Sequence, residues 1–434
     1  MNPADPVQSS PYWWDAAPLS ALPRLDLPAE ADVVVVGAGY TGLSAAITLA
    51  RAGRSVVIID RQRSGEGAST RNGGITSGNI RPSYTELVSS FGEARARGIV
   101  AEGKLAREDL RRFIESEGID CDYQLTGRFR GAMTADEYET GARQADELAR
   151  TMGIESYAVP RSAQHDYIGT DFYRGGDVRM DIGGVHPGKL HAGMLRVAIA
   201  AGVQVHDSTS VTSIERATAG FSVQTDRGAV RAGNVLMCTN GYTDSADPWL
   251  RRRIVPVRSR IIATEPLARD VMDKLMPPRM MYSDNRALSY YYRPSPDGTR
   301  ILFGGRDGTN SGDVESPTEH LKDELARIFP SLGQVRLTNS WFGFVAMHRD
   351  MIPRIFDHEG VFYATGCCGS GVVWARWLGT KVAHRLLGTR DSERSAFDFR
   401  PPRFVPFFRG NAWFMPAVFA VLKRRDQKRM AARD

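Results

Sequence analysis

The stretch that decides the fold is "ADVVVVGAGYTGLSAAITLARAGRSVVIID", residues 31–60. It opens with the β-branched run Val33 to Val36, which is typical of a strand buried on both faces of a parallel sheet. Gly37, Gly39 and Gly42 follow on the pattern G-x-G-x-x-G. The first glycine permits a tight turn, the second lets the backbone approach a pyrophosphate, and the third lets the next helix pack against the strand. These residues therefore predict a phosphate-binding turn.

The second half of the stretch completes this prediction. A helix is expected from Leu43 to Ala52, ending at Gly53 as its C-terminal cap. The next apolar run, Val56 to Ile59, ends in Asp60, near the spacing at which a carboxylate accepts a ribose hydroxyl. The helix dipole and the N-terminal amides would then face the phosphates. A G-x-G-x-x-G pattern alone is weak evidence, but strand, turn, helix, strand and acid in this order indicate a nucleotide site.

Length, composition and charge limit the possible domain organisation and partners. With 434 residues, the chain is long enough for two domains or for one large domain with a second lobe. Its hydrophobic fraction of 42% predicts an ordinary globular core. The net charge of +6 is spread along the chain without a nucleic-acid-binding motif, so we expect no nucleic-acid partner.

The sequence also bears on the cellular compartment. No apolar stretch is long enough to span a bilayer, and residues 1–18 lack the basic and apolar regions of a secretory signal. The four cysteines, two of them adjacent at Cys367 and Cys368, form neither a disulfide framework nor a zinc pattern. We therefore expect a cytoplasmic protein without a metal site.

The C-terminal region allows two interpretations. The apolar residues 412–422 precede the basic run "KRRDQKR", residues 423–429. Together they predict either a helix on a membrane surface or a helix docked on the protein with a solvated basic end. Pro416 interrupts the apolar stretch and docked termini are common, so we favour the docked helix.

A second glycine-rich turn lies far along the chain. Residues 360–388 are typical of a strand, a glycine turn and a helix. A cofactor contacted by both turns has to be long, which favours FAD over NAD. The helix expected near Ser370 would direct its positive end at the flavin pyrimidine and stabilise the anionic reduced form. Residues 255–310 alternate apolar and polar side chains, as in a mixed or antiparallel sheet.

Several stretches together carry a family resemblance: "VVVVGAGYTGLSAA", "GEGASTRNGG" (65–74), "GGVHPGKL" (183–190), "LMCTNGYT" (236–243), "IVPVRSRIIATEPL" (254–267), "WFGFVAMHRDMIP" and "ATGCCGSGV". In this order the chain resembles the D-amino acid oxidase-like FAD-dependent amine oxidases. The resemblance is closest to the gamma-glutamylputrescine oxidase branch, with sarcosine and glycine oxidase relatives. It covers roughly residues 10–425.

The resemblance implies an α/β fold of two lobes, with a Rossmann-like FAD-binding domain and a substrate domain built on a mixed or antiparallel sheet. We expect a discontinuous FAD-binding domain from residues 31–95, 175–245 and 345–390. The substrate domain would comprise residues 96–174 and 246–344. Residues 1–30 are expected to form an N-terminal arm, and residues 391–434 a tail with a docked helix.

The resemblance also implies which residues contact FAD. The first glycine turn would hold the pyrophosphate, Asp60 the adenosine ribose, and the backbone of Val211 the adenine. The other family motifs would lie along the pyrophosphate and the flavin. The implied set is Gly37, Gly39, Tyr40, Thr41, Gly42, Asp60, Arg61, Ser69, Arg71, Asn72, Gly73, Gly74, Val211, Thr239, Asn240, Gly241, Cys367, Gly369, Ser370, Gly371, Val372 and Val373.

One departure from the family concerns the attachment of the cofactor. In sarcosine-oxidase relatives a cysteine tethers the flavin within the stretch that aligns with "WFGFVAMHRD", and this chain has no cysteine there. We therefore expect non-covalent FAD, and we favour it over a tether at Cys367 or Cys368.

The expected chemistry needs orientation and charge more than acid and base groups. Tyr291 would line the pocket or pack in the core. Arg306 would hold a substrate carboxylate or provide a positive field for oxygen, the alternative being a surface arginine. His348 is a candidate base, and His186 a weaker one, although a lone histidine is more often structural.

The resulting hypothesis is an oxidase of the C–N bond of a small-molecule amine or amino acid. Hydride would pass to the flavin, the imine would hydrolyse, and O2 would be reduced to H2O2. Two alternatives stay open: a membrane-associated D-amino acid or imino acid dehydrogenase that passes electrons to a quinone, and a flavoprotein subunit that needs a partner. The sequence does not separate gamma-glutamylated polyamines, N-methyl amino acids, cyclic imino acids and D-amino acids as substrates.

Overall fold

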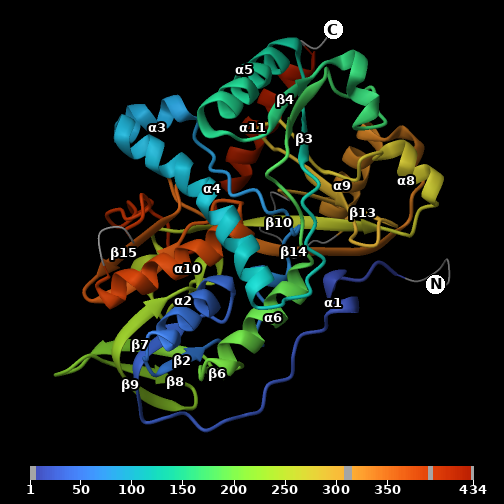
Figure 1. Cartoon of the computed structure of the whole chain (residues 1–434). Coiled ribbons are helices and arrows are strands. Elements are labelled where there is room, and N and C mark those ends of the chain that lie inside the picture. The colour runs from blue at the N-terminus through green and yellow to red at the C-terminus, as the bar shows by residue number, and fades with distance from the viewer. Residues whose placement is uncertain (1–5, 307–314, 390–393, 432–434) are drawn as a thin grey trace.

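The computed structural model describes residues 6–306, 315–389 and 394–431. Its strands form two eight-stranded sheets, each with its own helices (Figure 1). The long helix α4 (Glu93–Ser116) packs on α10 (Gly371–Leu387) and runs across the front of the molecule in that view. This arrangement confirms the predicted α/β fold with two lobes.

The first sheet contains the nucleotide-binding stretch. Its strand order is β15 (Arg354–His358), β16 (Val361–Thr365), β9 (Gly228–Met237), β1 (Glu30–Val36), β2 (Val56–Ile59), β6 (Gln204–His206), with β8 (Phe221–Thr225) paired to β9 and β7 (Val211–Arg216) paired to β8. β1 pairs in parallel with both β2 and β9. Val33 and Val35 pack in one apolar cluster and Val34 and Val36 in another, so the strand is buried on both faces as predicted.

Three helices cover one face of this sheet: α2 (Tyr40–Arg51), α6 (Pro187–Ala200) and α10. α2 begins three residues before the predicted start, directly at the glycine turn. α10 packs closely against α2, because a Cβ on Gly379 would lie only 2.3 Å from the carbonyl oxygen of Thr41. The N-termini of both helices are thereby held on the same side of the sheet.

The second sheet is mixed, as predicted. Its order is β14 (Leu337–Met347), β10 (Val255–Thr264), β13 (Ile301–Arg306), β12 (Tyr291–Pro294), β11 (Met281–Asp284), β3 (Arg128–Gly131), β5 (Gly176–Arg179), β4 (Ser156–Val159). Only the β11–β3 pair on this path is parallel. β5 lies within the segment 175–245 that we expected in the other domain. The division into domains otherwise stays a prediction.

The remaining described elements surround the sheets. They are α3 (Tyr84–Phe91), α5 (Ala135–Met152), α8 (Arg269–Leu275), α9 (Glu315–Ile328), α11 (Met415–Ala431), the short helices α1 (Trp13–Ala16) and α7 (Pro248–Arg251), and the 3-10 turns η1 (Ala68–Thr70), η2 (Arg161–Asp166), η3 (Asn240–Tyr242) and η4 (Pro330–Leu332). None of the helices in the described ranges is both long and apolar enough to cross a membrane.

Both ends of the described chain are attached to the body of the protein. Trp13 of α1 is fully buried, and its indole N–H donates to the carbonyl of Asn72 at 2.8 Å. At the other end, the buried Asp426 of α11 accepts hydrogen bonds from the backbone N–H groups of Ala287 and Leu288 at 2.7 and 2.9 Å. Both contacts reach loops that line the site described next.

Candidate active site

A first cavity lies at the carboxyl ends of β1, β2 and β9. The glycine turn, the end of β2, the loop before η1 and the turn before α10 contribute to its wall. Predicted cofactor residues that line it are Gly37, Gly39, Tyr40, Thr41, Asp60, Arg61, Ser69, Asn72, Val211, Thr239, Asn240, Cys367, Gly369 and Gly371. Segments that are more than 300 residues apart in the sequence therefore share one elongated cavity.

The geometry of the glycine turn leaves no room for side chains. Gly37 has a φ of +112°, and a Cβ on Gly42 would lie 1.9 Å from the carbonyl oxygen of Gly37. A Cβ on Gly39 would lie 2.8 Å from the Oγ of Ser69. That hydroxyl accepts a hydrogen bond from the N–H of Tyr40 at 2.9 Å, while no other described side chain caps the start of α2. The helix thus presents backbone N–H groups to the cavity.

Asp60 connects the turn to the second strand. Its carboxylate accepts hydrogen bonds from the N–H groups of Ala38 at 2.7 Å and Gln62 at 2.9 Å. Burial raises the pKa of Asp60 above its ordinary value, and these two donors oppose the rise. Since a carboxylate has about four lone-pair positions, it retains acceptor capacity for a ribose hydroxyl.

Two further turns meet in the wall of the same cavity. Asn240, in the left-handed conformation with a φ of +46°, accepts hydrogen bonds through its Oδ1 from the N–H of Gly366 at 3.0 Å and the hydroxyl of Thr365 at 3.3 Å. These bonds join the "TNG" turn after β9 to the "TGCCGS" turn before α10. Ser370 precedes α10 without capping it and shares a hydrogen bond of 2.9 Å with the hydroxyl of Ser77.

Asn72 organises the loop between these turns. Its side-chain amide donates to the carbonyls of Ala68 and Ser69 at 3.1 and 2.8 Å, and its Oδ1 accepts from the N–H of Gly74 at 2.8 Å. Arg71 beside it donates to the carbonyl of Glu66 at 2.7 Å. Both side chains therefore fix the shape of the loop that lies along the cavity.

A second cavity continues from the first, since Ala68, Asn72, Phe344, Val345, Gly369 and Gly371 line both. Its wall is formed by the loop 71–81 and the start of α10, and its floor by the second sheet. Predicted residues that line this cavity are Arg71, Gly73, Tyr291, Arg306, Ser370 and Val372, together with Asn72, Gly369 and Gly371.

The floor of the second cavity is one face of the second sheet. Tyr291 is in register with Ser283 on one side and Gly304 on the other, so these positions and Arg306 share a face. The alternate residues, among them Tyr292 and Phe303, pack in a buried aromatic cluster on the opposite face. The sheet is therefore apolar towards α8 and α9 and polar towards the second cavity.

Arg306 and Arg81 converge where the two cavities meet. A Cβ on Gly369 would lie 3.2 Å from one terminal nitrogen of Arg306 and 4.0 Å from one of Arg81. Burial lowers the pKa of Arg306 to about 10, and the neighbouring charge of Arg81 acts in the same direction. Among the described residues, neither guanidinium has a carboxylate partner. This end of the cavity is consequently suited to an anionic group.

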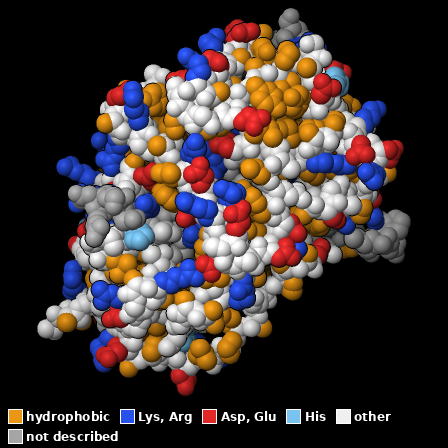
Figure 2. All heavy atoms as spheres, in the orientation of Figure 1, with side chains coloured by type: hydrophobic (Ala, Val, Ile, Leu, Met, Phe, Trp, Pro, Cys, Tyr) orange, Lys and Arg blue, Asp and Glu red, His pale blue; other side chains and the backbone are white. Residues whose placement is uncertain are grey.

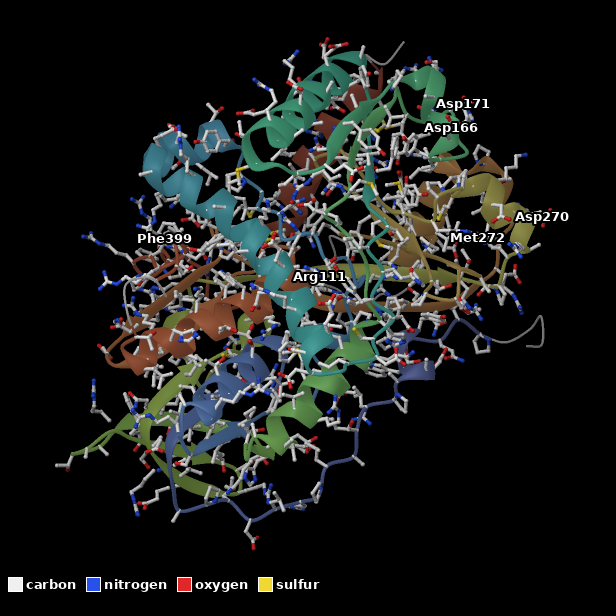
Figure 3. The ribbon with its side chains drawn as sticks, viewed as in Figure 1. Arg111, Asp166, Asp171, Asp270, Met272 and Phe399 are labelled. Atoms are coloured by element: carbon white, nitrogen blue, oxygen red, sulfur yellow. The ribbon has the colours of Figure 1, made fainter. Side chains whose placement is uncertain are left out.

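Nearby acids do not compensate these charges. In the described chain, Asp284 is the one carboxylate that lines the second cavity, and it pairs with Arg286 at 2.6 Å. Figure 3 shows other acidic side chains of this lobe, Asp166, Asp171 and Asp270, at its outer edge, and none of these three lines the second cavity. On the face drawn in Figure 2, basic and acidic side chains are intermingled. The excess of positive charge is therefore found in the second cavity and not on the surface shown in Figure 2.

Tyr291 separates the loop from the sheet. Its ring packs on Gly73, where a Cβ would lie 2.8 Å from it, and its hydroxyl shares a hydrogen bond of 3.1 Å with Ser259. Burial raises the pKa of Tyr291, so the phenol stays neutral at physiological pH.

His348 does not reach the site. It lines neither cavity, its Nδ1 lies 2.8 Å from the carbonyl oxygen of Ile352, and its ring packs against Gly366. Burial lowers the pKa of His348 to about 4. The expectation that it acts as a base therefore has to be corrected: the histidine supports the turn before α10 from behind. His186 likewise caps α6, accepting from the N–H of Lys189 at 3.2 Å.

Four other predicted residues support the cavities from behind: Gly42, Gly74, Gly241 and Val373 are absent from the described lining. Gly74 has a φ of +69°, and a Cβ there would lie 2.3 Å from the carbonyl oxygen of Val185. Lining residues that the sequence analysis missed include Ser77, Asn79, Arg81, Arg128, Arg130, Tyr242 and Phe344. A usable signal existed for one pair, because "RFRG" places Arg128 and Arg130 on one face of a strand.

The first cavity fits FAD. Its glycine turn is a cradle that any Cβ would fill, and its lining also contains Gly371 at the start of a second helix, α10. The carboxylate of Asp60 lines the same cavity, and its predicted contact with the adenosine ribose stays a proposal. The continuation into a second cavity gives a flavin room to lie between the nucleotide turn and the polar sheet face.

Comparisons with known proteins agree. The family model DAO, described as FAD dependent oxidoreductase, matches residues 32–385. The chain is 30% identical over 392 residues to the gamma-glutamylputrescine oxidoreductase of Escherichia coli (strain K12), covering 89% of this chain and 90% of that protein. It is 28% identical over 424 residues to the probable oxidoreductase OrdL of Rhizobium meliloti (strain 1021), covering 96% and 97%. The crystal structure of glycine oxidase from Geobacillus kaustophilus superposes with a TM-score of 0.73 at 19% identity, covering 88% of this chain and 100% of that one, and shows the same fold.

The chain therefore belongs to the DAO family of FAD-dependent oxidoreductases. It is an enzyme of the amine and amino acid class with FAD as its cofactor, and the non-covalent binding expected from the sequence stays a prediction.

Proposed function

We propose that this enzyme oxidises the C–N bond of an amine that carries a carboxylate, with O2 as the electron acceptor and H2O2 as a product. The observation that carries the proposal is the convergence of Arg81 and Arg306 beside Gly369, where the cofactor and substrate cavities meet. Arg306 is half-buried and Arg81 is exposed, and two guanidinium groups that converge without a described carboxylate partner favour an anionic ligand at this place.

The residues of the cavity would position the substrate and leave the redox chemistry to the cofactor. Bound FAD supplies the acceptor for a hydride from the carbon next to the amine nitrogen. Arg306 and Arg81 would hold the carboxylate, and the ring of Tyr291 would limit how the amine lies against the loop at Gly73. The start of α10 would stabilise negative charge at the adjoining end of the first cavity.

The proton of the amine would be lost to solvent. Among the described residues, the lining of the second cavity includes no histidine, its one carboxylate is paired with Arg286, and Tyr291 stays protonated. The amine would therefore bind in its neutral form, and the imine produced would be hydrolysed by water. We expect kcat/KM to rise with pH towards the pKa of the substrate amine.

The substrate classes that fit are gamma-glutamylated amines, which the name of the Escherichia coli relative suggests, N-methyl amino acids and other secondary amines with a carboxylate. An anaerobic titration of the purified holoenzyme with one amine of each class tests the proposal. A substrate should bleach the oxidised flavin band at roughly 450 nm, and air should restore it with stoichiometric peroxide. Amines without a carboxylate should be poor reductants.

A second candidate is a dehydrogenase that works at a membrane surface and reduces a quinone. It is favoured by the exposure of Phe407 and Trp413, at 93% and 60%, together with Val421 and the basic residues 423–425 of α11. This interpretation predicts binding to anionic vesicles, little peroxide in air, and rapid reoxidation by a soluble quinone. Peroxide formation without vesicle binding favours the oxidase.

A further inference from the structure

The end of the second cavity opposite Arg306 is also lined by arginines. Arg128 and Arg130 belong to β3, whereas Arg306 belongs to β13, three strands away in the same sheet. Since neighbouring strands lie about 4.8 Å apart, the two backbone positions are separated by roughly 14 Å. All three side chains start from the same face, because Arg128 is in register with Met281, and Met281 shares a face with Ser283 and Tyr291.

The distal arginines are part of an ion-pair network with too few acids. Its described members are Arg107, Arg128, Arg130 and Arg179 with Asp177 and Asp181. Asp177 lies 2.7 Å from Arg130 but 3.8 Å from Arg128, and Asp181 pairs with Arg107 and Arg179 at 2.5 and 2.9 Å. Four guanidinium groups thus share two carboxylates, which leaves a surplus of two positive charges.

Arg128 is the least satisfied member. Its side chain is 10% exposed, its pairing distance to Asp177 is the longest in the network, and its Nε has no hydrogen-bond partner among the described residues. Burial lowers the pKa of Arg128 to about 9, with the charge of Arg130 acting in the same direction. A buried cation in this state is stabilised by an anion from solution.

We propose that Arg128 and Arg130 form a second anion-binding subsite, and that the substrate is an amine with two acidic groups. One group binds Arg306 and Arg81 near the cofactor, and the other binds the distal pair on β3. Between them, Ser283 and Tyr291 line the same face and leave space for a chain of several bonds. The assignment of the reacting amine rests on the proposed function, whereas the subsite itself is a property of the cavity walls.

The subsite is tested by binding, without turnover. The holoenzyme is titrated with pimelate, a seven-carbon dicarboxylate, and with hexanoate, a monocarboxylate of similar length, and the shift of the flavin spectrum gives each Kd. Neither compound has an amine, so neither is oxidised. We expect pimelate to bind at least about tenfold more tightly than hexanoate, corresponding to the gain of one charge-assisted contact.

Three variants assign this preference to the distal pair. Arg128→Met should remove it while leaving the hexanoate Kd within about twofold, and Arg128→Lys should keep most of it. Arg269→Met, at an exposed arginine of α8, is the control for charge alone. The flavin spectrum and the unfolding temperature report whether each variant is folded, and Arg130→Met replaces Arg128→Met where the latter is not.

Equal affinities for pimelate and hexanoate, or a preference that survives Arg128→Met, would overturn the subsite. The amine panel separates this outcome from failure of the proposed function. If pimelate binds more tightly than hexanoate while no amine reduces the flavin, the subsite stands and the proposed amine chemistry is wrong. Should amines with one carboxylate reduce the flavin as efficiently as those with two, the amine chemistry stands and the dianionic substrate is wrong.

Discussion

The two cavities differ in the groups that line them: backbone in the first and side chains in the second. The first is made largely of backbone: Gly37, Gly39 and Gly42 bring peptide groups together, and the carboxylate of Asp60 is held by two backbone N–H groups. The second is made of charged and aromatic side chains on one face of a sheet, with Arg306 at one end and Arg128 at the other. The first suits a fixed cofactor, and we propose that the second selects what reacts with it.

This difference determines how each cavity responds to mutation. A backbone cradle fails when any atom is added, because its groups cannot move independently of the fold. A side-chain cavity retains its fold when one group is removed and loses only the matching ligand contact. The predictions below follow this distinction, from the largest effect to the smallest.

Gly42→Ala should have the largest effect. The added Cβ would lie 1.9 Å from the carbonyl oxygen of Gly37, so strand β1 and helix α2 would have to separate. We expect at least about 2 kcal/mol of lost stability and purification without bound flavin. Gly333→Ala is the control, since its Cβ would meet only the carbonyl oxygen of Pro330, at 3.5 Å. A yellow Gly42→Ala protein with normal stability would contradict the account of the turn.

Arg306→Met should leave the binding of the cofactor intact and weaken the binding of the substrate. The flavin spectrum and the unfolding temperature are expected to stay near those of the original protein, because no described carboxylate depends on this arginine. Loss of a charged contact to the substrate should lower kcat/KM about 100-fold in steady-state assays with a carboxylated amine. An equal loss for an amine without a carboxylate would show that Arg306 serves another purpose.

Asp60→Asn should weaken FAD binding by about tenfold, since the amide keeps one acceptor but loses the charged contact to a ribose hydroxyl. The measurement is the Kd of FAD for the apoprotein, from quenching of flavin fluorescence. kcat at saturating FAD should be unchanged. A variant with the original affinity would place the ribose elsewhere.

His348 provides the smallest effect, a pH dependence of stability. The unfolded histidine takes a proton below about pH 6.5, whereas the folded one stays neutral to about 4. The unfolded state binds more protons than the folded state in this window. The free energy of unfolding therefore decreases as the pH is lowered, by about 0.7 kcal/mol from pH 7 to pH 6. His348→Gln should flatten this part of the curve in urea titrations, and an unchanged slope would assign it to other groups.

The same contrast explains what the sequence could predict. The first cavity depends on motifs in which neighbours along the chain do one job, such as residues 31–60, so local patterns located it. The mixed second sheet was also predictable from its alternation. In the second cavity Arg81, Arg128 and Arg306 come from a loop and two strands far apart in the sequence, and no local pattern indicates that they line the same cavity.

His348 shows the converse limit. A histidine near a family motif suggested a base, but whether its ring points into a cavity or behind a turn depends on the packing of Gly366 and Ile352 around it. Both turns that meet at Asn240 were likewise predicted, but nothing in the sequence indicated the hydrogen bonds that join them. Tertiary contacts decide such cases.

The most direct test of the central claim is anaerobic reduction of the holoenzyme by a matched pair of secondary amines, one with a carboxylate and the other with a methyl group in its place. The account predicts that the carboxylated amine bleaches the flavin and that Arg306→Met removes this preference without loss of flavin. Reduction of the flavin by both amines at the same rate would contradict it.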